Sequence, residues 1–182
     1  FNTYCAGARG TELFYGIPNH QTVTWDGKDV HPFGTGAWRA PGNPTNTFAR
    51  ESQIDIMAHK IGMDPLEFRM KNIANERAMN SLELASQKFG WTGQKLPEGS
   101  GCGMAVGIDA GTFVTIIVEV TVSPKTGEVK VKRAVVGQDM GQVVNPEGTA
   151  IQAEGCVNMG LGYSLCEDLE FEWGKVKPVN FG

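Results

Sequence analysis

The sequence has no excess of positive charge and no long apolar run. It carries 16 lysines and arginines against 20 aspartates and glutamates, which gives a net charge of −4 at pH 7. Without a basic run, this balance argues against a general nucleic-acid-binding surface. The longest strongly apolar stretch, Thr112–Val122, is interrupted by Thr115, Glu119 and Thr121, whereas about 20 apolar residues are needed to span a bilayer. The sequence therefore predicts neither a nucleic-acid partner nor a membrane span.

Patterns that ligate metals are also missing. The four cysteines form no C-x-x-C pair, and none of the three histidines lies at ligand spacing from them. We therefore predict no metal ligand in this chain and no iron–sulfur cluster held by it. A chain of 182 residues can bury a core without disulfide cross-links. We interpret its cysteines as small buried thiols: Cys5, Cys102, Cys156 and Cys166.

Both ends of the sequence are abrupt. The first residue is Phe1 rather than methionine, and no charged-then-apolar leader precedes the part that reads as folded. The last residues, Val176–Phe181, read as an extended segment with no closing element after it. We interpret the chain as an internal fragment of a longer protein.

The first half of the sequence predicts helices. Apolar residues recur at helical spacing over Thr47–Ile61, and Gly62 follows where a left-handed C-cap belongs. Asp64 is the expected N-cap of a second helix whose first residue is Pro65. A third helix is expected over about Ser81–Phe89.

In the second half the pattern changes to strands. Cys102–Ile108, Thr112–Val122 and Glu128–Val136 read as strands, the last two as an antiparallel pair joined by a turn. A helix rich in small residues is expected from Asn145 to about Leu165, and a hairpin around Gly174. Because glycine lowers helix propensity, we expect another backbone or a ligand to approach that helix closely. The fold class is therefore α+β, with a helical part at 1–96 that carries a cofactor-facing loop and a hairpin–helix–hairpin part at 97–182.

The loop Gly36–Gly42 is the most informative segment. Its small residues leave the backbone accessible, so that a ligand can come close and accept backbone N–H bonds. Arg39 offers a planar guanidinium suited to phosphate or another anion. From composition alone, a surface loop whose arginine pairs with an acidic residue is the more frequent case.

Two long segments resemble one enzyme family. Gly36–Pro44, Glu51–Asp55 and Gly62–Asn72 resemble the molybdopterin-binding large subunit of the xanthine dehydrogenase and aldehyde oxidase family. Gly137–Leu161 resembles a second signature of the same subunit, in the same order. The short interval between the two resembles the branch that contains isoquinoline 1-oxidoreductase beta subunits. This double match makes a plain surface loop the weaker interpretation of Arg39.

The resemblance implies a cofactor-facing role for the loop. In that family the matching loop lies against the molybdenum centre, so Arg39 and its neighbours are expected to contact the cofactor or orient the substrate. Trp38 is expected either in the pocket wall or in the core. Pro41 stands where xanthine oxidases carry an aromatic residue, which disfavours a flat purine substrate. The expected cofactor-binding residues are Gly36, Ala37, Trp38, Arg39 and Ala40.

The family's reaction and partners follow from the same resemblance. It hydroxylates an electron-poor carbon of an aldehyde or N-heterocycle with water-derived oxygen, and a glutamate acts as base. The expected cofactor is molybdenum–molybdopterin in the cytosine dinucleotide form, with iron–sulfur clusters and flavin on partner chains. The expected partners are the remainder of the molybdenum-binding subunit, an iron–sulfur subunit and a small-molecule substrate. Cytoplasm and periplasm both remain open, the cytoplasm being slightly favoured.

The catalytic parts themselves are missing from the sequence. No Gly-x-Gly-Glu motif, which holds the family's glutamate base, occurs here. Glu51 and Asp55 are four positions apart on one expected helix face, but a solvated face, or pairing with Arg50 or Lys60, is the better interpretation than an acid–base pair. We therefore predict no catalytic residue and an inactive fragment. The alternative is a non-catalytic binding or assembly domain that keeps the fold without cofactor.

Overall fold

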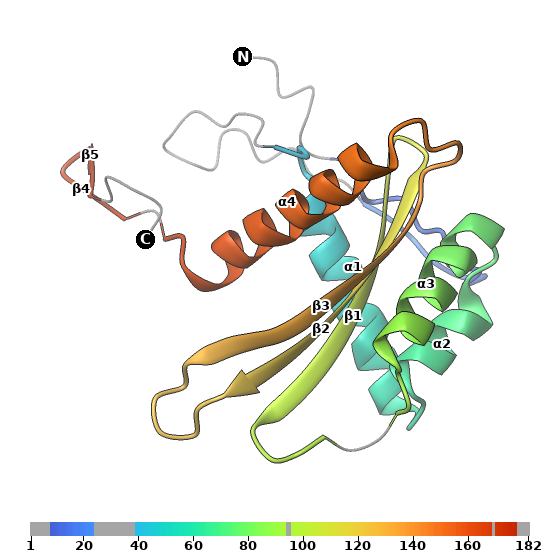
Figure 1. The fold of residues 1–182 in the computed structure, drawn as a ribbon, viewed down its shortest axis with the longest axis horizontal. Helices are drawn as coiled ribbons and strands as arrows, with labels where there is room; N and C mark the ends of the chain where they lie inside the picture. Colours follow the sequence, from blue (N-terminus) through green and yellow to red (C-terminus); the bar gives the residue numbers. More distant parts are fainter. Residues whose placement is uncertain (1–7, 24–38, 94–95, 169, 178–182) are drawn as a thin grey trace.

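A computed structural model describes residues 8–23, 39–93, 96–168 and 170–177. Within these ranges, helices and antiparallel strands combine in one α+β arrangement (Figure 1), which confirms the predicted fold class. The elements in chain order are α1 (Asn43–Lys60), α2 (Pro65–Asn72), α3 (Glu76–Phe89), β1 (Ser100–Asp109), β2 (Thr112–Val122), β3 (Val129–Asp139), α4 (Pro146–Leu165), β4 (Phe171–Glu172) and β5 (Lys175–Val176).

The main sheet has the order β1-β2-β3, and both pairings are antiparallel. The turn between β1 and β2 consists of Ala110 (φ 47°) and Gly111 (φ 76°). Positive φ at both central residues is typical of a two-residue type I′ turn, whose twist matches that of the strands. The predicted strands are confirmed, and each outer strand is longer than expected. The described part of the final hairpin, β4 with β5, also lies where it was expected.

One face of the sheet carries the core. Phe113, Thr115 and Ile117 alternate along β2 and are buried, and Thr115 Oγ1 lies 2.9 Å from the hydroxyl of Ser81 on α3. Helix α3 comes so close to β3 that a Cβ at Gly137 would collide with the Ser81 carbonyl oxygen. Glycine is therefore required there by close packing of the helix on the strand. The buried apolar residues of α3 complete this layer: Ala78, Leu82, Ala85 and Phe89.

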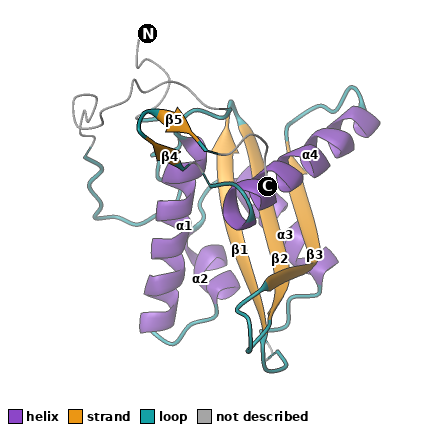
Figure 2. Cartoon of the chain, turned by 90° about the vertical axis from the view of Figure 1, so that its left-hand side faces the viewer, coloured by secondary structure: helices purple, strands orange, loops and turns teal. Residues whose placement is uncertain are grey.

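The other face of the sheet lies under α4 (Figure 2). The alternate residues Val114, Ile116 and Val118 of β2 point to this side and are half-buried. Every residue of α4 is described, and none is buried. The helix therefore covers the sheet loosely, in contrast to α3 on the opposite face.

The helix ends show which local signals the sequence carries. Helix α1 begins at Asn43, before the expected Thr47, because Pro44 fits the first turn. Helix α3 begins at Glu76, before the expected Ser81, because the Asn75 side chain accepts hydrogen bonds from the backbone of Arg77 and Ala78. The expected end signals are confirmed at Gly62 (φ 66°) and at Asp64, whose side chain caps α2.

The prediction of buried thiols is wrong for the described cysteines. Cys102, Cys156 and Cys166 are free and exposed, because no described residue of α4 or of the segment after it is buried and Cys102 lies on an accessible part of β1. Cys5 lies outside the described residues. Among the described helices, none is long and apolar enough to cross a membrane.

Asp64 provides a test of the helical layer. Its carboxylate accepts from Leu66 N at 2.8 Å and from Trp91 Nε1 at 3.1 Å. Asp64→Ala removes the cap and the indole contact together, so we expect the free energy of unfolding to fall by about 1–2 kcal/mol. Asp64→Asn keeps one acceptor oxygen and should lose less, as measured by urea unfolding. Equal losses in the two variants would contradict this account.

Candidate functional site

The structure describes two of the five predicted cofactor-binding residues. Gly36, Ala37 and Trp38 lie outside the described residues. Arg39 and Ala40 are described, and both are exposed. Ala40 has φ 57° and Gly42 has φ 70°, so two left-handed residues turn the chain into α1. Asn43 N donates to Ala40 O at 3.0 Å and closes this turn.

The Arg39 side chain reaches α4. Its Nη1 donates to the Met159 Sδ over 2.8 Å, a contact between residues 120 positions apart. A thioether is a weak acceptor, and a guanidinium has five N–H donors. Among the described residues, none with an acidic side chain forms an ion pair with Arg39. Most of its hydrogen-bonding capacity toward this part of the chain is therefore unused.

A pocket of about 430 Å³ lies between α4 and the face of the sheet opposite α3. Its floor is formed by apolar residues of β2 and β3, and its wall by one stripe of α4 that includes Ala153, Val157 and Leu161. The expected close approach of another backbone is not found at Gly155 or Gly160, where no described atom beyond the adjacent turns of α4 itself lies within 4 Å of an added Cβ. At Gly162, by contrast, an added Cβ would collide with the Glu167 side chain. Packing within the described chain therefore explains Gly162 but not Gly155 or Gly160.

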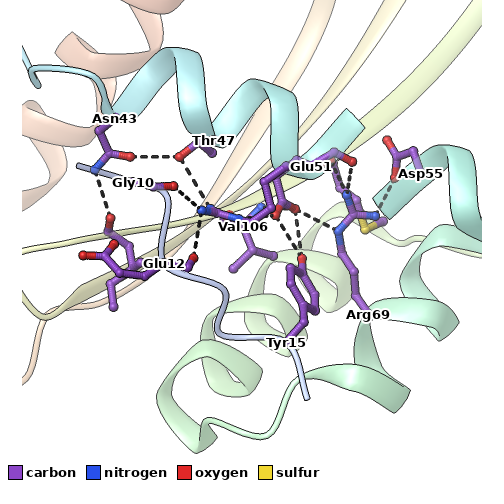
Figure 3. A network of polar contacts seen from close by, with 12 residues as sticks. Gly10, Glu12, Tyr15, Asn43, Thr47, Glu51, Asp55, Arg69 and Val106 are labelled. Carbon is purple, nitrogen blue, oxygen red and sulfur yellow. Dashed lines mark hydrogen bonds and ion pairs between the residues drawn. The ribbon is translucent and has the colours of Figure 1, made fainter. Parts of the chain in front are cut away.

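The carboxylates of Glu51 and Asp55 belong to a buried network (Figure 3). Glu51, 3% exposed, accepts hydrogen bonds from the Tyr15 hydroxyl at 3.0 Å, from Arg69 Nε at 3.1 Å and from Val106 N at 2.9 Å. Its other oxygen accepts from Arg50 Nε at 3.2 Å. The prediction of a solvated face is wrong for Glu51, and the predicted pairing with Arg50 is confirmed. With both oxygens occupied, Glu51 has no free position for a substrate proton.

Arg69 is the member of this network that the sequence argument missed. Its side chain is fully buried, and Nη1 donates to Asp55 Oδ1 at 2.6 Å while Nη2 donates to the Met104 carbonyl at 3.2 Å. The signal was present, because Arg69 falls at helical spacing from Leu66 and Ile73 on the apolar stripe of α2. A charged residue on such a stripe requires a buried partner.

The network also shifts two pKa values. Burial, together with the adjacent Glu51 carboxylate, raises the pKa of Tyr15 far above its ordinary value. Burial by itself lowers the pKa of Arg69, but the carboxylates of Glu51 and Asp55 outweigh it and leave that pKa raised. The hydroxyl of Tyr15 therefore stays protonated and the guanidinium stays charged.

Comparison with known families decides the identity of this fold. Two family models, both described as a molybdopterin cofactor-binding domain, match residues 46–182 and residues 5–73. The chain belongs to this family. The match confirms the resemblance to the molybdenum-binding subunit of the xanthine dehydrogenase family. The Arg39–Met159 contact joins the two matched segments, since Arg39 is covered only by the second of these models and Met159 only by the first.

Relatives of this molybdopterin cofactor-binding domain are much longer than the chain. It is 31% identical over 180 residues to a nicotinate dehydrogenase subunit of Pseudomonas putida, a match that covers 90% of this chain and 15% of the relative. It is 26% identical over 139 residues to the beta subunit of isoquinoline 1-oxidoreductase of Brevundimonas diminuta, covering 74% and 18%. It is 27% identical over 173 residues to the molybdenum-binding subunit of an Escherichia coli aldehyde oxidoreductase, covering 92% and 23%. The chain thus spans between 15% and 23% of the length of these relatives.

Glu51 is expected to be the most sensitive carboxylate in the domain. Glu51→Gln leaves the fully buried Arg69 without its full charge partner, and we expect the free energy of unfolding to fall by about 3–5 kcal/mol. The matched control is Asp55→Asn, because the Asp55 side chain is 33% exposed and its loss should cost about 1 kcal/mol or less. Urea unfolding measures both. A larger loss for Asp55→Asn would contradict the ranking.

Tyr15 is expected to limit stability at alkaline pH. Its raised pKa means that the folded chain holds the phenolic proton more tightly than the unfolded chain does. The stabilisation is therefore complete below about pH 10 and is lost progressively as the pH rises above that value. Tyr15→Phe should be less stable at neutral pH and should lose less stability between about pH 10 and pH 11. Identical slopes for the two proteins in that range would refute this assignment.

Proposed function

We propose that this domain forms part of the cofactor-facing wall of a molybdenum-dependent hydroxylase. The enzyme is an oxidoreductase that oxidises an aldehyde or N-heterocycle with water-derived oxygen. The observation that carries the proposal is the contact between Arg39 and α4, which joins both family-matched segments at one exposed place. The chain requires the rest of its subunit, and as a fragment it is inactive.

The residues at this place suit an anionic group such as the phosphate of molybdopterin. Arg39 is exposed, forms no ion pair with a described acid and keeps unused donors, which matches the planar, charge-assisted bonding that phosphates accept. The left-handed turn at Ala40–Gly42 presents backbone beside it. The proposed contacts with the cofactor, in its cytosine dinucleotide form, are made by Gly36, Ala37, Trp38, Arg39 and Ala40.

When bound, the cofactor supplies the redox chemistry of the hydroxylation. The residues of this chain bind and orient it. Glu51 takes no part as a base, since its oxygens already accept bonds from Tyr15, Arg50 and Arg69. The proton-accepting glutamate is therefore proposed to lie in the remainder of the subunit. Iron–sulfur clusters and a flavin on partner chains provide the path for electrons.

The substrate class is proposed from the relatives and from one residue. The names of the relatives refer to nicotinate, isoquinoline and aldehyde, which supports a small aldehyde or a nitrogen heterocycle. Proline at position 41 removes the aromatic wall that a flat purine would need. The compartment is proposed as cytoplasm or periplasm, with a slight preference for the cytoplasm.

The rival function is a binding or assembly domain without cofactor. Molybdenum per polypeptide, measured in the native complex purified from source cells, separates the two functions. Near-stoichiometric metal supports the hydroxylase. Absence of metal, in cells that fill their other molybdenum enzymes, supports the rival and removes the cofactor role of the Arg39 loop.

Arg39 is the residue to vary in the same complex. Arg39→Gln removes one charge-assisted contact, so we expect retention of molybdenum during equilibrium dialysis to weaken by about tenfold to a hundredfold. The control is Lys125→Gln, which removes one exposed positive charge in the turn between β2 and β3 and should leave retention unchanged. Equal retention in all three proteins would refute the role of Arg39.

A further inference from the structure

Two side-chain hydrogen bonds of Asn43 fix the backbone that follows Arg39, and neither of them involves the Arg39 side chain. Asn43, at the start of α1, is 9% exposed and donates from Nδ2 to the Ile108 carbonyl on β1 at 2.9 Å. The Thr47 hydroxyl donates to Asn43 Oδ1 at 2.8 Å. These bonds and the closed turn at Ala40 set the backbone beside Arg39. The long side chain beyond it keeps many rotamers, which an ordered binding site has to restrict.

Met159 is the described residue that restricts this side chain. Its sulfur accepts from Arg39 Nη1 at 2.8 Å, and Met159 itself is half-buried on α4. Gly155 lies one helical turn earlier on the same side of α4 and has open space around it. Position 155 therefore places no side chain on this side of the helix, next to the turn that carries Met159.

The chemistry of the acceptor matters as much as its position. A carboxylate at position 159 would orient Arg39, but it would also neutralise the guanidinium and compete with an incoming anion. A thioether is neutral and only weakly accepting. It takes up one N–H group while leaving the positive charge and the remaining donors available.

We propose that Met159 is a positioning residue for Arg39: its thioether orients the guanidinium toward the anionic group of the cofactor without neutralising it. This inference rests on the proposed function, and it adds a role for α4 in that site. Met159 acts through Arg39 and does not itself need to contact the cofactor.

A double-mutant cycle in the full complex tests the proposal. The variants are Met159→Leu, which keeps size without an acceptor of this kind, Met159→Gln, which restores a neutral acceptor, and each combined with Arg39→Gln. The readout is molybdenum retained per polypeptide in equilibrium dialysis. Met159→Leu should weaken retention roughly three- to tenfold, the range of one ordinary hydrogen bond, and Met159→Gln should return it to within about twofold of the parent.

The decisive comparison is the effect of Met159→Leu in the two backgrounds. With Arg39→Gln already present, Met159→Leu should weaken retention no further, because the group it positions is gone. Thermal unfolding of the apo complex should be the same for the leucine and glutamine variants. An equal fold-loss in both backgrounds, or a glutamine variant as weak as the leucine variant, would overturn the positioning role.

A further variant keeps the test informative if Met159→Leu fails to assemble. Met159→Glu supplies a charged acceptor, which should hold Arg39 but retain less molybdenum than Met159→Gln. Equal or stronger retention by Met159→Glu would count against the proposal.

Failure of the underlying function is distinguishable, because Arg39→Gln by itself would then retain molybdenum as the parent does. If Arg39→Gln weakens retention and Met159 acts independently of it, only the positioning role fails.

Discussion

The ion pair between Glu51 and Arg69 ties helices α1 and α2 to strand β1. Burying two charges is unfavourable unless their hydrogen bonds are satisfied, and here the pair draws donors and acceptors from α1, α2, β1 and the segment before α1. Glu51 accepts from the Val106 backbone, and Arg69 donates to the Met104 carbonyl. Because these partners come from four parts of the chain, the pair fixes the orientation of α1 relative to β1.

The candidate site depends on that orientation. Helix α1 begins at Asn43, directly after the turn that carries Arg39 and Ala40. Arg50 on the same helix donates to the carbonyls of Gly10 and Val106. These bonds fix the N-terminal half of α1 both to the segment before it and to β1. The exposed guanidinium of Arg39 therefore projects from a rigid base, although the loop itself has few apolar side chains. Helix α1 therefore connects the buried network around Glu51 directly to the exposed turn that carries Arg39.

The elements were predictable from sequence where the signal is local. The side chain of Asp64 caps its own helix, and Gly62 and Gly90 end helices by adopting positive φ, all within a few residues of the pattern that indicates them. Among the partners of Glu51, the adjacent Arg50 was predictable in this way, but Arg69 and Val106 were not, because they approach it only through folding. The same holds for the contact of Arg39 with Met159, whose sequence positions gave no sign of pairing. Resemblance to a family singled out the loop that carries Arg39, whereas the contact of that loop with α4 emerged only from the fold.

The two faces of the sheet differ in how tightly they are covered, and this difference governs exchange with solvent. On the α3 side, Gly137 lets helix and strand meet without a gap, so we expect amide hydrogens of β2 to exchange at a free energy close to that of global unfolding. On the other side, α4 has no buried residue and a pocket of about 430 Å³ beneath it. We therefore expect the amide hydrogens of α4 to exchange through local opening, at a free energy well below that of global unfolding. We therefore expect the helix that meets Arg39 to open more readily than α3 does.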